Sequence, residues 1–158
     1  METMHKGRHE GKGHYGRLLL MTALSFVAMF VLMYAMVDRL ANVYINFNQA
    51  YMAGLMAAPM VILEVVLMRG MYPDARLNAA IVSVAVLTMA LCWAAIRQQS
   101  AISDRQFLRS MIPHHAGAVL MCEQNKLEKP ELMRLCQGIV SSQKAEIALM
   151  KSELEQVE

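Results

Sequence analysis

The sequence predicts an all-α membrane protein, in which three transmembrane helices precede an exported two-helix hairpin. The first observation is composition: 56% of the 158 residues are hydrophobic and the mean hydropathy is +0.33, which is high for a soluble domain. The second is that three apolar stretches, each about twenty residues long and so able to cross a bilayer, occupy the first two thirds of the chain. The last third instead repeats apolar residues at helical spacing.

Residues 1–17 form a polar, glycine-rich segment that also carries basic residues and His5, His9 and His14. A segment of this composition cannot bury enough apolar surface to fold, so it is expected to be a disordered tail. The histidines fit either a weak metal-scavenging role or an incidental basic tail, and the sequence does not decide between them.

Residues 18–96 are expected to hold the three spans. The first, 18–37, contains twenty residues without a charge. A cleaved signal peptide would have a shorter apolar core and an A-x-A-like site, so this segment is expected to be a retained span. The second, 50–68, is interrupted by Pro59, and the third covers 79–96. The polar connections between the spans are short, which predicts antiparallel neighbours.

The distribution of basic residues predicts the orientation, because cytoplasmic loops carry an excess of Lys and Arg. A cytoplasmic N-terminus places six basic residues inside and four outside, and it exports residues 97–158. We therefore expect a bacterial inner-membrane protein with a periplasmic C-terminal hairpin. The inside set is Lys6, Arg8, Lys12, Arg17, Arg69 and Arg76, and the outside set is Arg39, Arg97, Arg105 and Arg109.

Two helices are expected in the exported part. Ser103 followed by Gln106 is a capping box, which predicts a helix over 104–126. Pro113 interrupts this helix and either kinks it or marks the point where it restarts. Pro130 opens the second helix, which is expected to end near residue 156, so the two helices form a hairpin.

The first of these helices gathers soft metal ligands on one face. Met111, His114, His115, Met121 and Cys122 fall within a sector of about 120° at helical periodicity. Thioether and imidazole groups are suitable ligands for Cu(I). The chain also contains 16 Met residues, an unusually high number. The pattern indicates a copper site.

A hairpin that turns near Lys129 brings polar residues of the second helix opposite this face. Gln143 and Glu146 interrupt the apolar stripe there, and buried polar groups require partners. Either they hydrogen-bond structural histidines, or they ligate a metal and orient its ligands. The pairs expected to face each other are Cys122 with Cys136, His115 with Gln143, Ile112 with Glu146, and Leu108 with Met150.

Together these segments resemble the bacterial domain-of-unknown-function 305 family over roughly residues 103–155. The shared pattern is an acidic residue, an aromatic, M-x-x-H-H and a further Met, followed downstream by Q-x-x-E-I-x-x-M. The resemblance implies a ferritin-like helical fold and copper binding, and the three-span half is similar to a membrane-anchored subgroup found with copper-resistance genes. The matching residues are Asp104, Phe107, Met111, His114, His115, Met121, Gln143, Glu146, Ile147 and Met150.

The chain departs from this family in two respects. A full family domain has four helices, whereas the exported part has two. Either two chains form a four-helix bundle, or the hairpin packs against the membrane spans. Cys122 and Cys136 are also outside the pattern. In an oxidising exterior they can form a disulfide, and the alternative is that they bind copper.

The second span carries a stripe of Met52, Met56, Met60 and Met68, with Glu64 at the same four-residue spacing. Packing explains most Met stripes in membrane helices. An ionisable residue at membrane depth suggests function, so a Cu(I) relay ending at Glu64 is one alternative. A protonated Glu64 hydrogen-bonded between spans is the other.

These observations predict a membrane-anchored protein that sequesters copper or hands it to an exporter or chaperone. The small net charge of +2 argues against nucleic-acid binding. We expect no enzymatic activity, because a di-iron oxidase needs E-x-x-H motifs that these helices lack. A metal-free scaffold that dimerises is the other alternative. The expected ligands are Met111, His114, His115, Met121, Glu146 and Met150.

Overall fold

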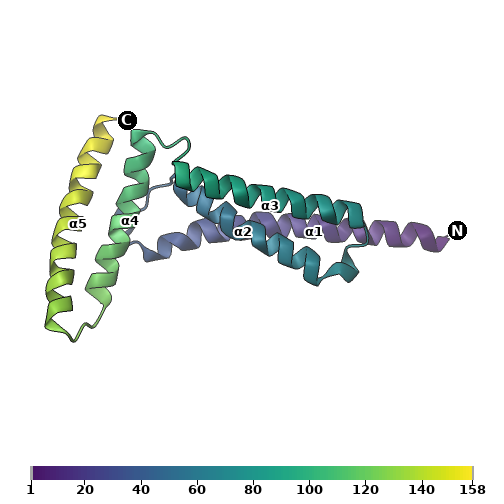
Figure 1. Ribbon diagram of the computed structural model, residues 1–158, viewed down its shortest axis with the longest axis horizontal. Helices are drawn as coiled ribbons and strands as arrows, with labels where there is room; N and C mark the ends of the chain where they lie inside the picture. The colour runs from purple at the N-terminus through teal and green to yellow at the C-terminus, as the bar shows by residue number, and fades with distance from the viewer. Residues whose placement is uncertain (1, 158) are drawn as a thin grey trace. The chain divides into compact units, whose positions relative to one another are not determined.

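The computed structural model describes residues 2–157, with side chains from residue 13 onward, and this part of the chain is all-α (Figure 1). It divides into two compact units: residues up to 31 with 50–100, and residues 32–49 with 101–158. The long helices are α1 (Glu2–Leu32), α2 (Phe47–Leu67), α3 (Ala75–Gln98), α4 (Asp104–Gln124) and α5 (Pro130–Gln156), and the short 3-10 helices are η1 (Met33–Met36), η2 (Leu40–Asn42) and η3 (Arg69–Met71).

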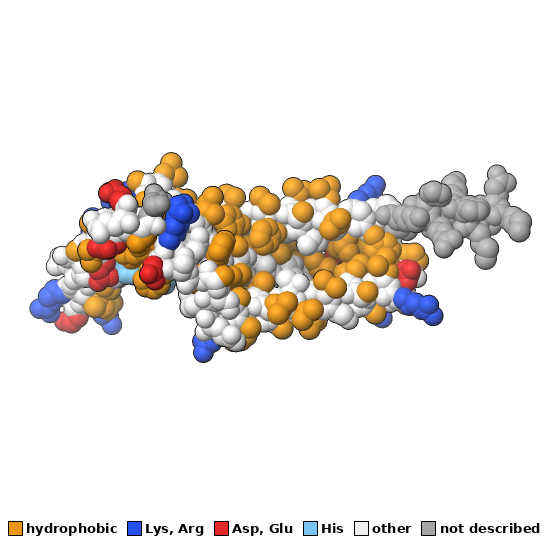
Figure 2. Space-filling view, turned by 90° about the horizontal axis from the view of Figure 1, so that it is seen from above, with side chains coloured by type: hydrophobic (Ala, Val, Ile, Leu, Met, Phe, Trp, Pro, Cys, Tyr) orange, Lys and Arg blue, Asp and Glu red, His pale blue; other side chains and the backbone are white. Residues whose placement is uncertain are grey.

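The three expected spans are confirmed by length and composition. Segments Gly13–Met36, Phe47–Leu67 and Ala75–Gln98 are long and apolar enough to cross a membrane. Hydrophobic side chains cover the surface of these helices (Figure 2). Such a surface is unfavourable in water, so these three helices have the surface expected of membrane spans.

The N-terminal segment differs from the expected disordered tail. α1 begins at Glu2, so residues 2–17 are helical. A helix that has nucleated in the apolar segment extends at little further cost, because each added residue gains a backbone hydrogen bond. The Tyr15 hydroxyl also donates to Asn78 Oδ1 at 2.7 Å. His5 and His9, for which metal scavenging is one of the two alternatives, lie outside the residues whose side chains are described.

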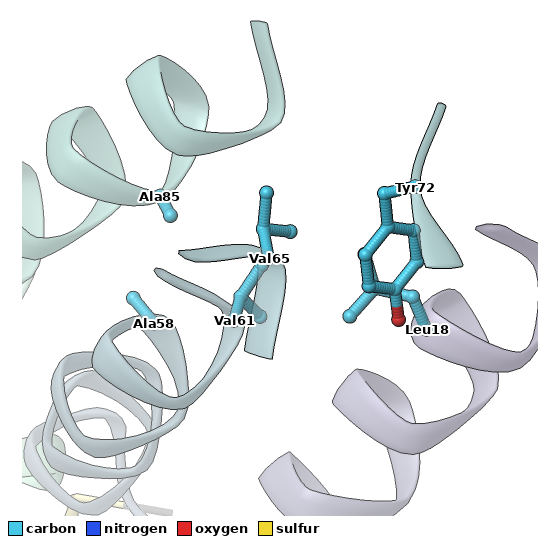
Figure 3. Packing of buried hydrophobic residues seen from close by; sticks show 6 residues of the cluster. All are labelled: Leu18, Ala58, Val61, Val65, Tyr72 and Ala85. Carbon is cyan, nitrogen blue, oxygen red and sulfur yellow. The ribbon is translucent and has the colours of Figure 1, made fainter. Parts of the chain in front are cut away.

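Small residues of α2 lie where it packs against α3 in the first unit. Gly54 packs so closely against α3 that a Cβ there would lie 3.0 Å from Cys92 Sγ. Ala58, four residues later, belongs to the main buried cluster (Figure 3). Gly54 and Ala58, four residues apart on α2, therefore allow the neighbouring helix to approach closely. The whole cluster is Leu18, Ala58, Val61, Val65, Tyr72 and Ala85.

The Met stripe of α2 lies outside this core. Met52, Met56 and Met60 are exposed on the surface of the unit. Glu64 is partly buried and accepts a hydrogen bond from the Tyr72 hydroxyl at 3.1 Å, so its partner lies in the connection before α3 and not in another span. Burial and the hydrogen bond to Glu64 raise the pKa of Tyr72. The relay interpretation stays a prediction.

The second unit contains the predicted hairpin of α4 and α5 (Figure 1). The side chain of Ser103 accepts a hydrogen bond from the Gln106 amide, which confirms the N-terminal cap. α4 continues through Pro113 as one helix, so the interpretation that it restarts there is wrong. It ends at Gln124, two residues before the expected end at 126.

A disulfide joins the two helices near the turn. Cys122 and Cys136 are bonded, with their Cα atoms 5.3 Å apart. This confirms the predicted pairing of the two residues. Both sulfur atoms are used in this bond, so the oxidised protein does not offer them as copper ligands.

Residues 32–49, expected to be only the end of the first span and a connection, form part of the hairpin unit. The Phe47 amide donates to Gln106 Oε1 at 3.0 Å, and Lys151 Nζ donates to the Ala41 carbonyl at 2.9 Å. The hairpin unit therefore includes residues 32–49, which the expected domain of residues 97–158 leaves out. We call residues 32–49 the layer. This layer covers α4 on a side that α5 does not.

Asn46 fixes this layer in place, and we expect an Asn46→Ala substitution to destabilise the unit by about 2 kcal/mol, because it leaves buried groups without partners. The side chain is only 2% exposed and donates to the carbonyls of Tyr44 and Arg109, while its Oδ1 accepts from the Gln49 amide. Hydrogen exchange of the α4 amides would show the loss. An equal change after substitution of the exposed Asn125 would contradict this role.

Candidate metal centre

His115 lies between the two helices of the hairpin and is 8% exposed. Its Nδ1 is 2.9 Å from the Met111 carbonyl oxygen, and its Nε2 is 2.7 Å from Glu146 Oε2. A carbonyl only accepts hydrogen bonds, so Nδ1 carries a hydrogen and donates it. Nε2 is thus the nitrogen that faces the carboxylate.

Gln143 was expected to face His115, but the residue that the His115 ring bonds is Glu146, about one helical turn farther along α5. The prediction counted residues evenly from a turn at Lys129. This count holds at the Cys122–Cys136 disulfide, but seven residues farther from the turn on α4 the His115 ring bonds a residue three positions beyond the expected one. The alternative in which a structural histidine bonds Glu146 is confirmed for His115.

Two methionines flank this pair. Met111 is four residues before His115 on α4, and Met150 is four residues after Glu146 on α5. The helices are antiparallel, so both residues lie one turn from the pair in the same direction, on facing helices. Both are partly buried, and Met150 packs against the apolar cluster around Ile112. We call Met111, His115, Glu146 and Met150 the inner set.

His114 and Met121, the remaining predicted ligands, lie outside the inner set. His114 is exposed although its ring centroid is 6.0 Å from that of His115, and Met121 is 55% exposed. Histidine surface is visible on the hairpin in Figure 2. Met121 is ten residues from Met111, a rise of about 15 Å, which is more than two Met side chains can span through one ion. The six predicted ligands therefore do not form one site: four belong to the inner set, and His114 and Met121 lie apart from it.

The inner set has the chemistry of a soft-metal site. It offers one imidazole and two thioethers, which are suited to Cu(I), and one carboxylate, a harder group that can orient the imidazole. Histidines that bind metals usually donate their other ring N–H to a carbonyl or carboxylate, as His115 does to Met111. Over residues whose side chains are described, no three His, Cys, Asp or Glu side chains converge, so a site here depends on the thioethers.

The Met111 carbonyl is the one functional group of this centre that was not predicted from the sequence. Its only sequence signal is the four-residue spacing to His115, which allows a side chain to reach the backbone one turn earlier. That spacing is too common in helices to identify the bond without the structure.

Comparison with known proteins agrees with the resemblance in the hairpin motifs. The family model described as "Domain of unknown function (DUF305)" matches residues 83–154, which contain all of α4 and most of α5. An uncharacterized protein of Acanthamoeba polyphaga mimivirus is 30% identical over 142 residues, covering 88% of this chain and 91% of the relative. No solved structure matches the chain significantly.

Proposed function

We propose that this protein, which belongs to the domain-of-unknown-function 305 family, is a membrane-anchored copper-binding protein. Its three apolar helices hold it in the bilayer, and the inner set on α4 and α5 binds Cu(I). The bound ion is sequestered or passed to a copper exporter or chaperone, which contributes to copper tolerance.

The proposed location is a bacterial inner membrane with the hairpin in the periplasm. Two observations support it. The basic residues favour a cytoplasmic N-terminus and an exported hairpin. The disulfide between Cys122 and Cys136 is of the kind that persists in oxidising compartments and is rare in the cytosol.

The orientation of His115 is the observation that carries the proposal. The Met111 carbonyl holds Nδ1–H, so the free electron pair of a neutral imidazole is on Nε2, directed at Glu146. In the proposed site a copper ion binds this electron pair, between the imidazole and the carboxylate. Glu146 is half-exposed, which leaves its carboxylate free to bind the ion or to turn aside.

A metal-free scaffold is the competing function, and one observation favours it. Both ring nitrogens of His115 already have partners, so the pair also serves as a tie between helices. In that case the protein carries no copper, and the hairpin exists to present a surface for dimerisation.

Elemental analysis of the full chain separates these functions. We expect protein purified from copper-supplemented cells to contain copper, and a Met111→Leu/Met150→Leu variant to contain much less, because Leu preserves apolar packing but offers no thioether. Met133→Leu is the matched control, since Met133 is exposed on α5 away from the inner set. Equal copper in all three proteins would contradict the assignment, and no copper in any of them would favour the scaffold.

A further inference from the structure

The exposed face of α4 has a regular pattern. From Gln106 to Met121, only Phe107, His114 and Met121 are exposed, and every other residue of this stretch is at least partly buried. α5 and residues 32–49 cover the other sides of the helix. Seven residues make about two helical turns, so these three side chains lie in one line along α4. We call them the free stripe.

The free stripe is symmetric about His114. Ser110 and Ala118, four residues to either side, are small and partly buried. Phe107 and Met121, seven residues to either side, are large and apolar, with exposed fractions of 49% and 55%. The order is large, small, His, small, large in both directions along the helix. Such a surface is complementary to itself, as a two-fold interface between identical chains requires.

A second copy that packs on this stripe brings the two His114 side chains together. His114 is the central residue, so this holds whether the paired helices run parallel or antiparallel. The small residues beside it leave room for the imidazoles, while the large residues at the ends bury apolar surface. Two imidazoles facing each other in such an interface require a common partner, because a buried polar group without one is costly.

Copper is a suitable partner for the two imidazoles. A single chain offers only one exposed imidazole here, and the nearest thioether of the stripe is about 10 Å farther along the helix. The His115 ring of the same copy has its centroid 6.0 Å from that of His114, but it is buried and both its nitrogens have partners. A second exposed imidazole is therefore supplied by a second copy. We propose that a copper ion binds between the His114 side chains of two copies and links them through their free stripes. This proposal rests on the proposed function only in that the metal is copper.

The test is the mass and copper content of the full chain in detergent micelles, titrated with Cu(I) kept reduced by ascorbate. We expect copper to convert monomers to dimers. His114→Ala should remain monomeric at all copper concentrations and lose the ion shared by each pair of chains. Met121→Ala should weaken the dimer, whereas the control Met133→Ala, which removes a similarly exposed thioether from α5, should not.

The two proposals fail in different ways. In His115→Ala the inner set is damaged but the free stripe is intact, so copper should still produce dimers. If His114→Ala dimerises as readily as the unaltered protein, or if the metal-free protein is already fully dimeric, the shared site is overturned. If copper produces dimers but the inner-set variants bind as much of it as the unaltered protein, the assignment of the inner set as the binding site fails and the shared site stands. If the unaltered chain binds no copper, both fail.

Discussion

A His115→Ala variant of the full chain should bind Cu(I) at the inner site more than about 100-fold more weakly, since even the loss of a group that only orients a metal ligand costs 10–100-fold. His115 supplies the only imidazole of the inner set, and its Nε2 already faces the carboxylate of Glu146 at 2.7 Å. Competition with a chromophoric Cu(I) chelator, at protein concentrations too low for dimers, would measure the change.

Because His115 is buried, its removal also perturbs the fold, and a second variant separates the two effects. Glu146 is half-exposed, so Glu146→Ala leaves a smaller defect in the packing of the hairpin. We expect it to weaken copper binding by about 10–100-fold, with the hydrogen exchange of the α4 amides nearly unchanged. If both variants bind copper as tightly as the unaltered protein, the inner set is not the binding site.

The elements of this fold were predictable because their signals are local. Uncharged stretches identified the three spans, and the Ser103 cap and Pro130 located the starts of the two hairpin helices. The disulfide was also predictable, because Cys122 and Cys136 lie close to the turn, where the pairing of two helices has little freedom. Counting residues evenly from the turn placed Gln143 opposite His115, which is farther along the helices, whereas His115 bonds Glu146.

The layer formed by residues 32–49 could not be predicted from its composition. Asn46 is polar and lies in a connecting segment, where an exposed position is the ordinary expectation. Its burial depends on the backbone of residues more than sixty positions later in the chain, such as Arg109. This has a practical consequence: a fragment of residues 97–158 lacks the layer, so copper measurements require the full chain.

The division between His114 and His115 was partly predictable. Adjacent residues of a helix point about 100° apart, so the two imidazoles cannot both face α5. The broad sector used to group the ligands concealed this difference. The structure shows which one faces inward: His115 is buried, and His114 is exposed on the free stripe.

Replacing both Cys122 and Cys136 by Ser should reduce the free energy of unfolding of the hairpin by about 3 kcal/mol, the usual contribution of a disulfide that closes a loop of this length. The two residues are 14 positions apart, across the turn between α4 and α5. Hydrogen exchange of the α4 and α5 amides would measure the loss. The amides of α3, in the other unit, are an internal reference, and Cys92→Ser controls for the removal of a thiol that forms no disulfide.

The same variant tests how the hairpin holds its inner set. Seven residues of α4 and ten of α5 separate the disulfide from the His115–Glu146 pair, and the layer of residues 32–49 independently fixes α4 beyond that pair. We therefore expect the stability to fall while copper affinity changes by less than about tenfold, which is 1.4 kcal/mol. A complete loss of copper binding in a folded variant would mean that the cysteines act as ligands after reduction. An unchanged hydrogen-exchange rate would mean that packing alone fixes the two helices.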